Sequence, residues 1–221
     1  KAEEVKNRLH ETAYLNPALT ICFEDRRGSE PESIIYHEPE GIVGFVKSIN
    51  RNKDTVHEVI YVKGESDGIT VEAAFQYVNE FHENVMGFCN NIFNAEGGTH
   101  LTGFKTIFTT VINSYARQLN ILKEKDANFT GPDVRNGMTA VVSIKHPDPR
   151  FEGQTKTKLD NQDAAKVVSK VVGDEITRYF DRNLETLKSI IGCAEKAAKI
   201  RKTEEKAKTR GEGGQSAGEA G

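Results

Sequence analysis

The sequence predicts an α+β fold in which helices lie on one face of a β-sheet. Two observations lead to this class. Strand-like and helix-like segments follow one another through the middle of the chain, in the order β-β-β-α-turn-β-loop-α. The helix-like segments have an apolar stripe along one side, as a helix that packs on a sheet requires. With 221 residues, of which 37% are hydrophobic and 29% charged, the chain is long enough to bury a substantial core.

The first 53 residues form a separate unit in this interpretation. Residues 1–15 have apolar side chains at helical spacing, and Pro17 ends that helix. The segments ALTICFEDR and ESIIYH, joined by RGSEPE, are typical of a β-hairpin. In EGIVGFVKSINRN the apolar residues share one face, which predicts a short amphipathic helix. The polar stretch 50–55 that follows is a candidate domain boundary.

Three strand candidates come next: VHEVIYVK, ITVEAAFQYV and NVMGFCNNI. The short turns GESDG and NEFHE separate them, so we expect an antiparallel meander. Gly97 and Gly98 break the last strand, and Thr99 is a good N-cap for the helix that follows. That helix is expected to carry a broad apolar stripe from Leu101 to Tyr115.

The second half predicts further elements around one long polar loop. TGPDVRNG is expected to form a single helical turn with Pro132 at its first position, and MTAVVSIKH is the clearest strand in the chain. The polar loop PDPRFEGQTKTKLDN follows it. Two helices come after the loop, from about Asp160 to Arg182 and from Leu184 to about Thr209. The glycine-rich residues 209–221 are expected to be disordered.

Composition and motifs exclude several functional classes. A net charge of −3 gives no global basic excess, so any contact with nucleic acid must be local. The chain lacks a P-loop, a strand-anchored GxGxxG and HExxH, and its six histidines are scattered, so no metal site is expected. It has no signal peptide and no apolar run long enough to span a membrane. With three dispersed cysteines, this predicts a cytoplasmic protein. The chain starts without Met within a helix-like segment, so we expect a fragment of a longer protein.

Two lysines are candidates for phosphate contacts on the residue pattern alone. Lys156 stands in GQTK, on a glycine-hinged loop that leaves a buried strand, and Gln154 beside it adds neutral amide donors. Lys105 lies in the second turn of the helix after EGGTH, off its apolar stripe. For each, the simpler alternative is a solvated surface residue or a plain connecting loop.

Two further segments have a structural and a functional interpretation. EGGTH is by default a strand end, a glycine hinge and a helix cap, and the alternative is a hinge beside a moving helix. Residues 195–210 contain seven basic and three acidic residues. This composition is usual for a solvated helix face, and it favours DNA only slightly.

Three segments closely resemble the ATPase subunits of bacterial type II DNA topoisomerases, the DNA gyrase B family above all: YHEPEGIVGFVKSINRNK, EGGTHLTGFKT and TGPDVRNGMTAVVSIKHPDPRFEGQTKTKL. The similarity runs from residue 1 to about residue 208, and HPDPRFEGQTKTKL is its most specific part. The topoisomerase IV ATPase subunits share GGTH and QTK, so both families stay open at this point. An ATP-independent nucleic-acid-binding module is the alternative from another class.

The resemblance implies two domains. Residues 1–53 would be the last part of a GHKL ATP-binding domain, and residues 54–208 a transducer domain with the fold of ribosomal protein S5 domain 2. That fold includes a left-handed βαβ crossover, an exception to the usual right-handed rule. The family's catalytic glutamate and its magnesium-binding asparagine would lie upstream of residue 1. The complete protein would therefore be an ATP-hydrolysing DNA topoisomerase that uses ATP and Mg²⁺, and this chain alone would be inactive.

The resemblance also implies roles for individual residues. In the family, the QTK loop reaches from the transducer into the ATP site. Carried over, Lys156 is the catalytic residue that touches the γ-phosphate, and Gln154 and Thr155 belong to the same ATP-binding loop. Lys105 stands where the family has a basic residue that faces DNA, often an arginine. The implied partners are double-stranded DNA, a second copy of the same protein upon ATP binding, and the gyrase A protein in an A2B2 heterotetramer, with no membrane.

Overall fold

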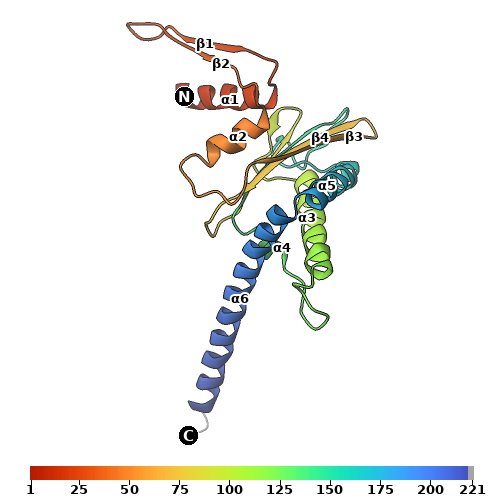
Figure 1. Cartoon of the computed structure of the whole chain (residues 1–221). Coiled ribbons are helices and arrows are strands. Elements are labelled where there is room, and N and C mark those ends of the chain that lie inside the picture. Colours follow the sequence, from red (N-terminus) through yellow and green to blue (C-terminus); the bar gives the residue numbers. More distant parts are fainter. Residues whose placement is uncertain (219–221) are drawn as a thin grey trace.

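A five-stranded mixed sheet lies at the centre of the structure, a computed structural model that describes residues 1–218, with side chains described for residues 1–211. Its strand order is β3-β4-β7-β5-β6. The strands are β3 (Ile60–Ser66), β4 (Ile69–Tyr77), β5 (Asn84–Cys89), β6 (Ile92–Phe93) and β7 (Met138–Lys145). The molecule is mixed α and β, which confirms the predicted α+β class (Figure 1).

The predicted antiparallel meander is confirmed for β3 and β4, which pair antiparallel, but it is wrong for β5, because β7 lies between β4 and β5. Strand β7 pairs antiparallel with β4, where Phe75 faces Ala140, and parallel with β5, where Met86 faces Val141. Seven of the eight residues of β7 are buried, as a strand covered on both faces requires. Strand β5 therefore connects to β7 through helices, as a βαβ crossover. The left hand expected of this crossover stays a prediction.

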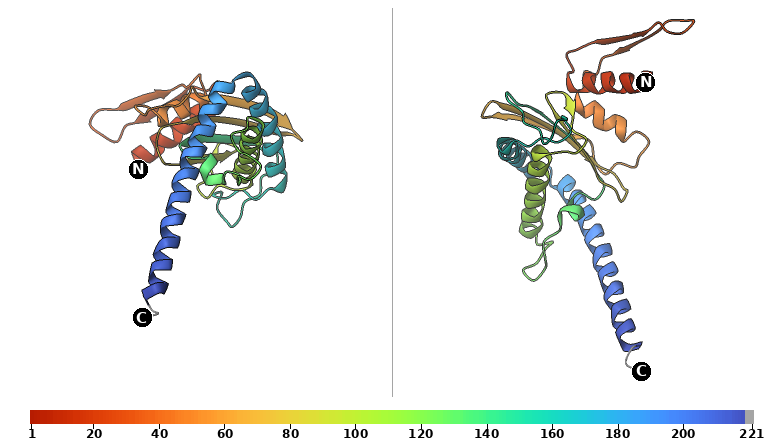
Figure 2. Two further views of the ribbon diagram at one scale, coloured as in Figure 1. Left: turned by 60° about the horizontal axis from the view of Figure 1, so that its bottom comes forward. Right: turned by 180° about the vertical axis from the view of Figure 1, so that it is seen from behind.

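Two long helices cover one face of the sheet: α3 (Thr99–Gln118) and α5 (Gln162–Arg182). They run side by side beneath the strands (Figures 1 and 2). The buried Phe104, Phe108 and Ile112 of α3 form one core with alternate residues of the central strands, such as Phe75. The apolar stripe predicted for this helix is confirmed, and it holds α3 in place against the sheet.

The N-terminal residues cover part of the other face. Helices α1 (Ala2–Leu15) and α2 (Ile42–Ile49) contribute Tyr14 and Phe45 to a second core, which includes Phe88 of β5 and Val141 of β7. Between these helices, β1 (Ile21–Asp25) and β2 (Glu32–Tyr36) form the predicted hairpin. Helices on both faces of the sheet differ from the one-face arrangement predicted. The helices on this second face, α1 and α2, belong to residues 1–53, which were predicted to form a separate unit. The domain boundary near residue 53 stays a prediction.

The C-terminal helix α6 (Leu184–Gly218) projects away from the body of the molecule (Figures 1 and 2). Its first turns are anchored by buried apolar residues, the last of which is Ala198. The helix extends to Gly218, and residues 219–221 lie outside the described part; the disorder expected of residues 209–221 stays a prediction. In residues 1–218, no helix combines the length and apolar character that crossing a membrane demands.

The short helix α4 (Gly131–Val134) precedes β7 and begins with a capping box. The Thr130 side chain accepts a hydrogen bond from the Asp133 backbone N–H, and the Asp133 carboxylate accepts one from the Thr130 N–H. Gly131 takes the first helical position, so Pro132 is at the second position rather than the first. The single turn that was predicted here is confirmed.

Candidate functional site

The QTK loop, defined as residues 147–161, is a narrow hairpin-like excursion between β7 and α5. Phe151 and Leu159 form an antiparallel bridge, and the Glu152 N–H donates to the Lys158 carbonyl at 2.9 Å. Gly153 follows with φ of +81°, a conformation that favours glycine. The tip residues 154–156 are exposed. The two legs of the loop are thus paired, and its tip extends into solvent.

The base of the QTK loop is anchored by His146, a buried residue at the end of β7. Its Nδ1 accepts a hydrogen bond from the Asp148 N–H at 2.9 Å. Because Nδ1 accepts, Nε2 is the donor, and it donates to the Asp163 carboxylate, with oxygens at 2.9 and 3.0 Å. This hydrogen bond from His146 lowers the pKa of Asp163. The far leg is fixed where the Arg150 N–H donates to Asn161 Oδ1 at 2.6 Å.

The EGGTH segment supports the loop from one side. The Leu159 N–H donates to the Gly97 carbonyl at 3.0 Å, and the Thr99 N–H donates to the Leu159 carbonyl at 3.1 Å. The Glu96 N–H donates to the Thr157 carbonyl at 2.8 Å. These backbone bonds join the loop to the first residue of α3. The EGGTH segment and the QTK loop are therefore one structural unit, which the sequence did not indicate.

The predicted N-cap at Thr99 is wrong. Gly98 occupies the cap position, with φ of +140°, and Thr99 is already the first helical residue. The Thr99 hydroxyl is buried without a hydrogen-bond partner in the described residues. The pairing of the preceding segment with Leu159 sets the backbone here, so the intrinsic capping preference of threonine does not decide where α3 begins.

Two side chains outside the loop reach its tip. Asn94 Nδ2 donates to the Lys156 carbonyl at 2.8 Å. The Thr157 hydroxyl donates to Glu96 Oε2 at 2.6 Å and lies 2.8 Å from the Thr155 hydroxyl. Sequence reasoning missed Asn94 because 62 residues separate it from Lys156. Its place shortly before the glycine pair Gly97-Gly98 was a weak local signal.

The two lysines of the loop differ in their surroundings. Lys158 forms an ion pair with Glu152 at 3.0 Å, and this hydrogen bond raises the pKa of Lys158. Lys156, by contrast, is exposed and forms no ion pair with any side chain among residues 1–211. Gln154 beside it is exposed as well. The loop tip thus presents one ammonium group and one amide that are available to an incoming anion, as a phosphate contact requires.

Lys105 lies on a different surface, in the second turn of α3. Its Nζ is 3.5 Å from Glu83 Oε1, which also accepts a hydrogen bond from Arg135 Nε at 2.5 Å. The Lys105 side chain is 36% exposed. Glu83 thus compensates the charge of Lys105 in this structure. The predicted contact of Lys105 with DNA stays a prediction.

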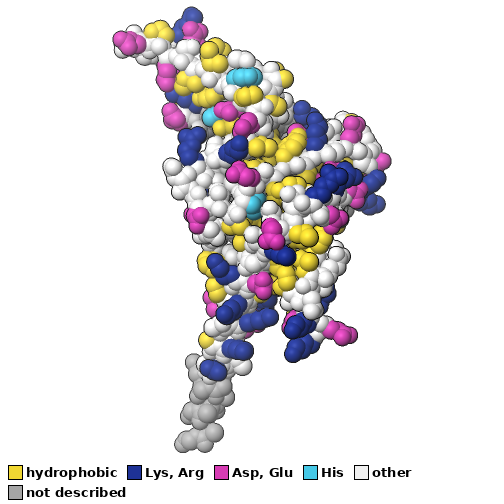
Figure 3. Space-filling model, in the orientation of Figure 1, with side chains coloured by type: hydrophobic (Ala, Val, Ile, Leu, Met, Phe, Trp, Pro, Cys, Tyr) yellow, Lys and Arg dark blue, Asp and Glu magenta, His cyan; other side chains and the backbone are white. Residues whose placement is uncertain are grey.

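The basic residues of α6 fall into two groups. Arg201 donates to the buried Asp133 of the capping box at 2.9 Å and to Glu205 at 3.3 Å. Burial alone would raise the pKa of Asp133, but the hydrogen bonds from Arg201 and Thr130 lower it overall. Most of the other basic side chains lie along the projecting part of the helix, as Figure 3 shows. Arg201 therefore anchors α6, and the rest form a solvated charged surface.

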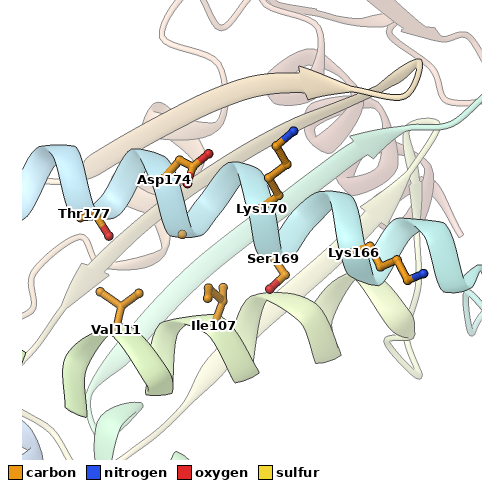
Figure 4. A pocket seen from close by; sticks show the side chains of 8 residues that line it. Ile107, Val111, Lys166, Ser169, Lys170, Asp174 and Thr177 are labelled. Carbon is orange, nitrogen blue, oxygen red and sulfur yellow. The ribbon is translucent and has the colours of Figure 1, made fainter. Parts of the chain in front are cut away.

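A groove of about 530 Å³ lies between α3 and α5, away from the QTK loop (Figure 4). Ile107 and Val111 point from α3 toward α5, whereas Lys170 points away from α3. The groove is open, and its polar groups do not converge on a point. Converging polar groups are what fix a ligand in a specific site, so this groove is not a candidate ligand site.

Comparisons with known proteins extend this picture. The family model described as DNA gyrase B matches residues 41–210. The DNA gyrase B protein of Streptococcus pneumoniae serotype 4 is 45% identical over 200 residues, which are 90% of this chain and 31% of that protein. The chain therefore spans about a third of the length of that curated relative.

Two solved structures are similar in fold and sequence. The 43K ATPase domain of Thermus thermophilus gyrase B, in complex with an aminocoumarin, matches with a TM-score of 0.82 and 30% identity, covering 95% of this chain and 56% of that one. The topoisomerase IV ATP-binding domain of Francisella tularensis, in complex with a small-molecule inhibitor, gives a TM-score of 0.76 and 26% identity, covering 91% and 54%. Because the family model spans most of the sequence, with the QTK loop and its EGGTH support inside the match, the chain belongs to the DNA gyrase B family.

Proposed function

We propose that this chain is the energy-coupling part of an ATP-dependent type II DNA topoisomerase of the gyrase type. The observation that carries the proposal is the uncompensated ammonium group of Lys156, at the tip of a loop whose base is tied to β7 and α3. The names of the relatives support the same conclusion, because the curated protein is a DNA gyrase B and the solved structures are ATPase or ATP-binding domains.

Lys156 and Gln154 are the residues that would meet a nucleotide. An ammonium group is a compact charge with three donors, and it stabilises the negative charge that develops on phosphoryl oxygens during transfer. The amide of Gln154 adds neutral donors beside it, and Thr155 completes the tip. ATP, when bound, supplies the phosphoryl group that is transferred to water, and Mg²⁺ supplies positive charge beside its phosphates.

We take the ligand of Mg²⁺ to lie outside this chain. The described residues contain no group of three His, Cys, Asp or Glu side chains that could hold an ion. The nucleotide site would then be completed by residues that this chain does not contain. In this proposal the 221-residue chain alone does not hydrolyse ATP at a measurable rate, and turnover by the purified chain would contradict it.

The hydrogen bonds between the QTK loop and α3 could transmit a movement of the loop from the nucleotide site to a DNA-contacting surface. Leu159 accepts a hydrogen bond from the first residue of α3, and Lys105 lies in the second turn of the same helix. A displacement of the QTK loop would therefore move the helix that carries Lys105. Double-stranded DNA is the partner proposed for Lys105, because one lysine on a partly exposed face suits a backbone phosphate.

The proposal extends to the partners of the complete protein. These are a second copy of the same protein, which would associate on ATP binding, and the gyrase A protein in an A2B2 heterotetramer, in the cytoplasm. Negative supercoiling is the activity proposed for that assembly. The topoisomerase IV ATPase subunit is the second candidate, since the Francisella tularensis domain has the same fold at 26% identity. The gyrase type is preferred because the matching family model is that of DNA gyrase B.

The test replaces each lysine of the loop in the full-length protein. Lys156→Ala is expected to lower the kcat of ATP hydrolysis by about 100-fold or more, the usual cost of losing one group that stabilises the transition state. Lys158→Ala is the matched control, because Lys158 is already paired with Glu152. It should leave kcat within about twofold. Normal ATP turnover in Lys156→Ala would refute the proposed role of this residue.

A further inference from the structure

We propose that Asn94 is a positioning residue for Lys156, and that His100 fixes the orientation of Asn94. This inference rests on the proposed role of Lys156 and assigns a function to two buried residues in the EGGTH region. Asn94 would hold the backbone at the loop tip, so that the lysine ammonium group is placed before a nucleotide arrives. The arrangement is specific enough to be tested one hydrogen bond at a time.

Asn94 is buried among exposed neighbours. It is 1% exposed, whereas Phe93, Ala95 and Glu96 are all exposed. Its backbone N–H donates to the Gly87 carbonyl of β5 at 2.9 Å. Its side chain makes the two further bonds, from Nδ2 to the Lys156 carbonyl at 2.8 Å and between Oδ1 and His100 Nε2 at 3.0 Å. One residue therefore connects a central strand, a helix and the loop tip.

The chemistry of the groups fixes which way each one points. A carbonyl oxygen only accepts hydrogen bonds, so the NH₂ group of Asn94 must face Lys156. The amide oxygen then faces His100, and Nε2 must carry the ring proton. Burial lowers the pKa of His100 to about 4, so the ring is neutral near pH 7. Its Nδ1 is buried without a partner in the described residues, which leaves the bond to Asn94 as the only one the ring makes there.

A glycine in β5 makes room for the histidine ring. A Cβ atom on Gly87 would lie 2.7 Å from His100 Nε2, which is closer than real Cβ contacts come. The ring is thus wedged between β5 and α3. Because the ring cannot move, its Nε2 holds the Asn94 amide oxygen in place. The NH₂ group of Asn94 then stays directed at the Lys156 carbonyl.

The other supports of the loop reach the tip less directly: the Thr157 hydroxyl, which donates to Glu96 Oε2 at 2.6 Å, lies 2.8 Å from the Thr155 hydroxyl. The bonds from Glu96 to Thr157 and from Leu159 to Gly97 join backbone to backbone below the tip. In the described residues, Asn94 is the buried side chain that hydrogen-bonds within residues 154–156. Without its bond, the tip would be held only through the contact between the Thr155 and Thr157 hydroxyls, and the backbone at Lys156 would turn more readily about Gly153. A catalytic group that is misplaced by a small distance loses rate through orientation, even when its chemistry is unchanged.

The experiment uses Asn94→Asp in the full-length protein. The variant has the same shape and still accepts from His100, but its carboxylate cannot donate to the Lys156 carbonyl. We expect kcat for ATP hydrolysis to fall about tenfold while KM for ATP stays within about twofold. Hydrogen exchange of the Glu96 and Leu159 amides, which bond the loop, should become faster. Asn94→Ala, which adds no charge, should give the same pattern.

Asn113→Asp is the matched control. Asn113 is a buried asparagine on α3 that holds a different loop, through bonds to the backbone of Phe129 at 2.8 and 3.0 Å. Its replacement should lower the melting temperature and leave kcat unchanged. Equal losses of kcat in the Asn94 and Asn113 variants would show a general effect of destabilisation and would overturn the inference.

A double variant separates the positioning role of Asn94 from the proposed function. If Asn94 acts through Lys156, then Asn94→Asp should cause no further loss of kcat in a Lys156→Ala background. A further tenfold loss in that background would overturn the positioning role. If Lys156→Ala alone has normal activity, the proposed function fails. If Lys156→Ala is inactive and Asn94→Asp has wild-type kcat, only the positioning role fails.

Discussion

Gly98 and Leu159 are in direct backbone contact at the point where the QTK loop meets α3. A Cβ atom on Gly98 would lie 2.4 Å from the Leu159 carbonyl oxygen and 2.6 Å from its nitrogen. Gly98 also has φ of +140°, which side chains rarely adopt. Gly98→Ala is therefore expected to destabilise the protein by about 1–3 kcal/mol through backbone strain, and more if the loop separates from the helix. Urea unfolding measures this free energy.

The control for Gly98 is Gly192→Ala in α6. A Cβ atom there would meet nothing within 4 Å, and the residue lies inside a regular helix. Alanine should stabilise this position by about 1 kcal/mol, because glycine is a poor helix former. The prediction for Gly98 is contradicted if both replacements change the free energy of unfolding in the same direction.

Local patterns predicted most of the elements but not their order in the sheet. The apolar run of β7 and the stripe of α3 are visible within a few residues, because side-chain periodicity reflects which face is buried. The position of β7 between β4 and β5 depends on pairings such as Val85 with Ala140, far apart in sequence. Turn residues between β4 and β5 favoured a hairpin, and no local signal opposed it.

The candidate site, too, could be predicted from the sequence only where the signal was local. Lys156 was found because it belongs to a specific motif, and its exposure fits that assignment. Asn94, His146 and Asp163 were missed, because their roles come from contacts that the folded chain creates.

Lys105 and Glu83 give a prediction on DNA binding. Lys105→Ala in the full-length protein is expected to weaken binding to double-stranded DNA and to reduce the slope of log affinity against log salt by about 1. Glu83→Gln should act in the opposite direction, since Lys105 would lose the carboxylate 3.5 Å away. Fluorescence anisotropy over a range of salt concentrations measures both effects.

The matched control for Glu83 is Glu65→Gln, which makes the same charge change on the edge strand β3. It should leave the affinity for DNA nearly unchanged. Equal gains in affinity for the two glutamine variants would point to net charge alone. An unchanged salt slope in Lys105→Ala would remove this lysine from the DNA-contacting surface.

Asp133 and Arg201 predict how stability depends on pH. Their hydrogen bond at 2.9 Å joins the capping box of α4 to α6, and the pKa of Asp133 is lowered from 3.8 in the folded state. A carboxyl group with a lowered folded pKa contributes stability above its unfolded pKa, and this contribution is lost as the pH falls through the folded value. The wild-type protein should therefore lose this stabilisation below about pH 4, and at pH 7 it should be fully present.

Asp133→Asn tests this by removing the titrating group while keeping the side-chain shape. The variant should be less stable than wild type at pH 7, by about 1–3 kcal/mol, because Arg201 and Thr130 lose a charged acceptor. The difference between wild type and variant should shrink between pH 4 and pH 2, measured by urea unfolding at each pH. Asp163→Asn is a useful comparison, because that carboxylate also has a lowered pKa but binds His146 at the loop base. A constant difference between wild type and Asp133→Asn across this range would mean that the ion pair with Arg201 does not stabilise the anchor of α6.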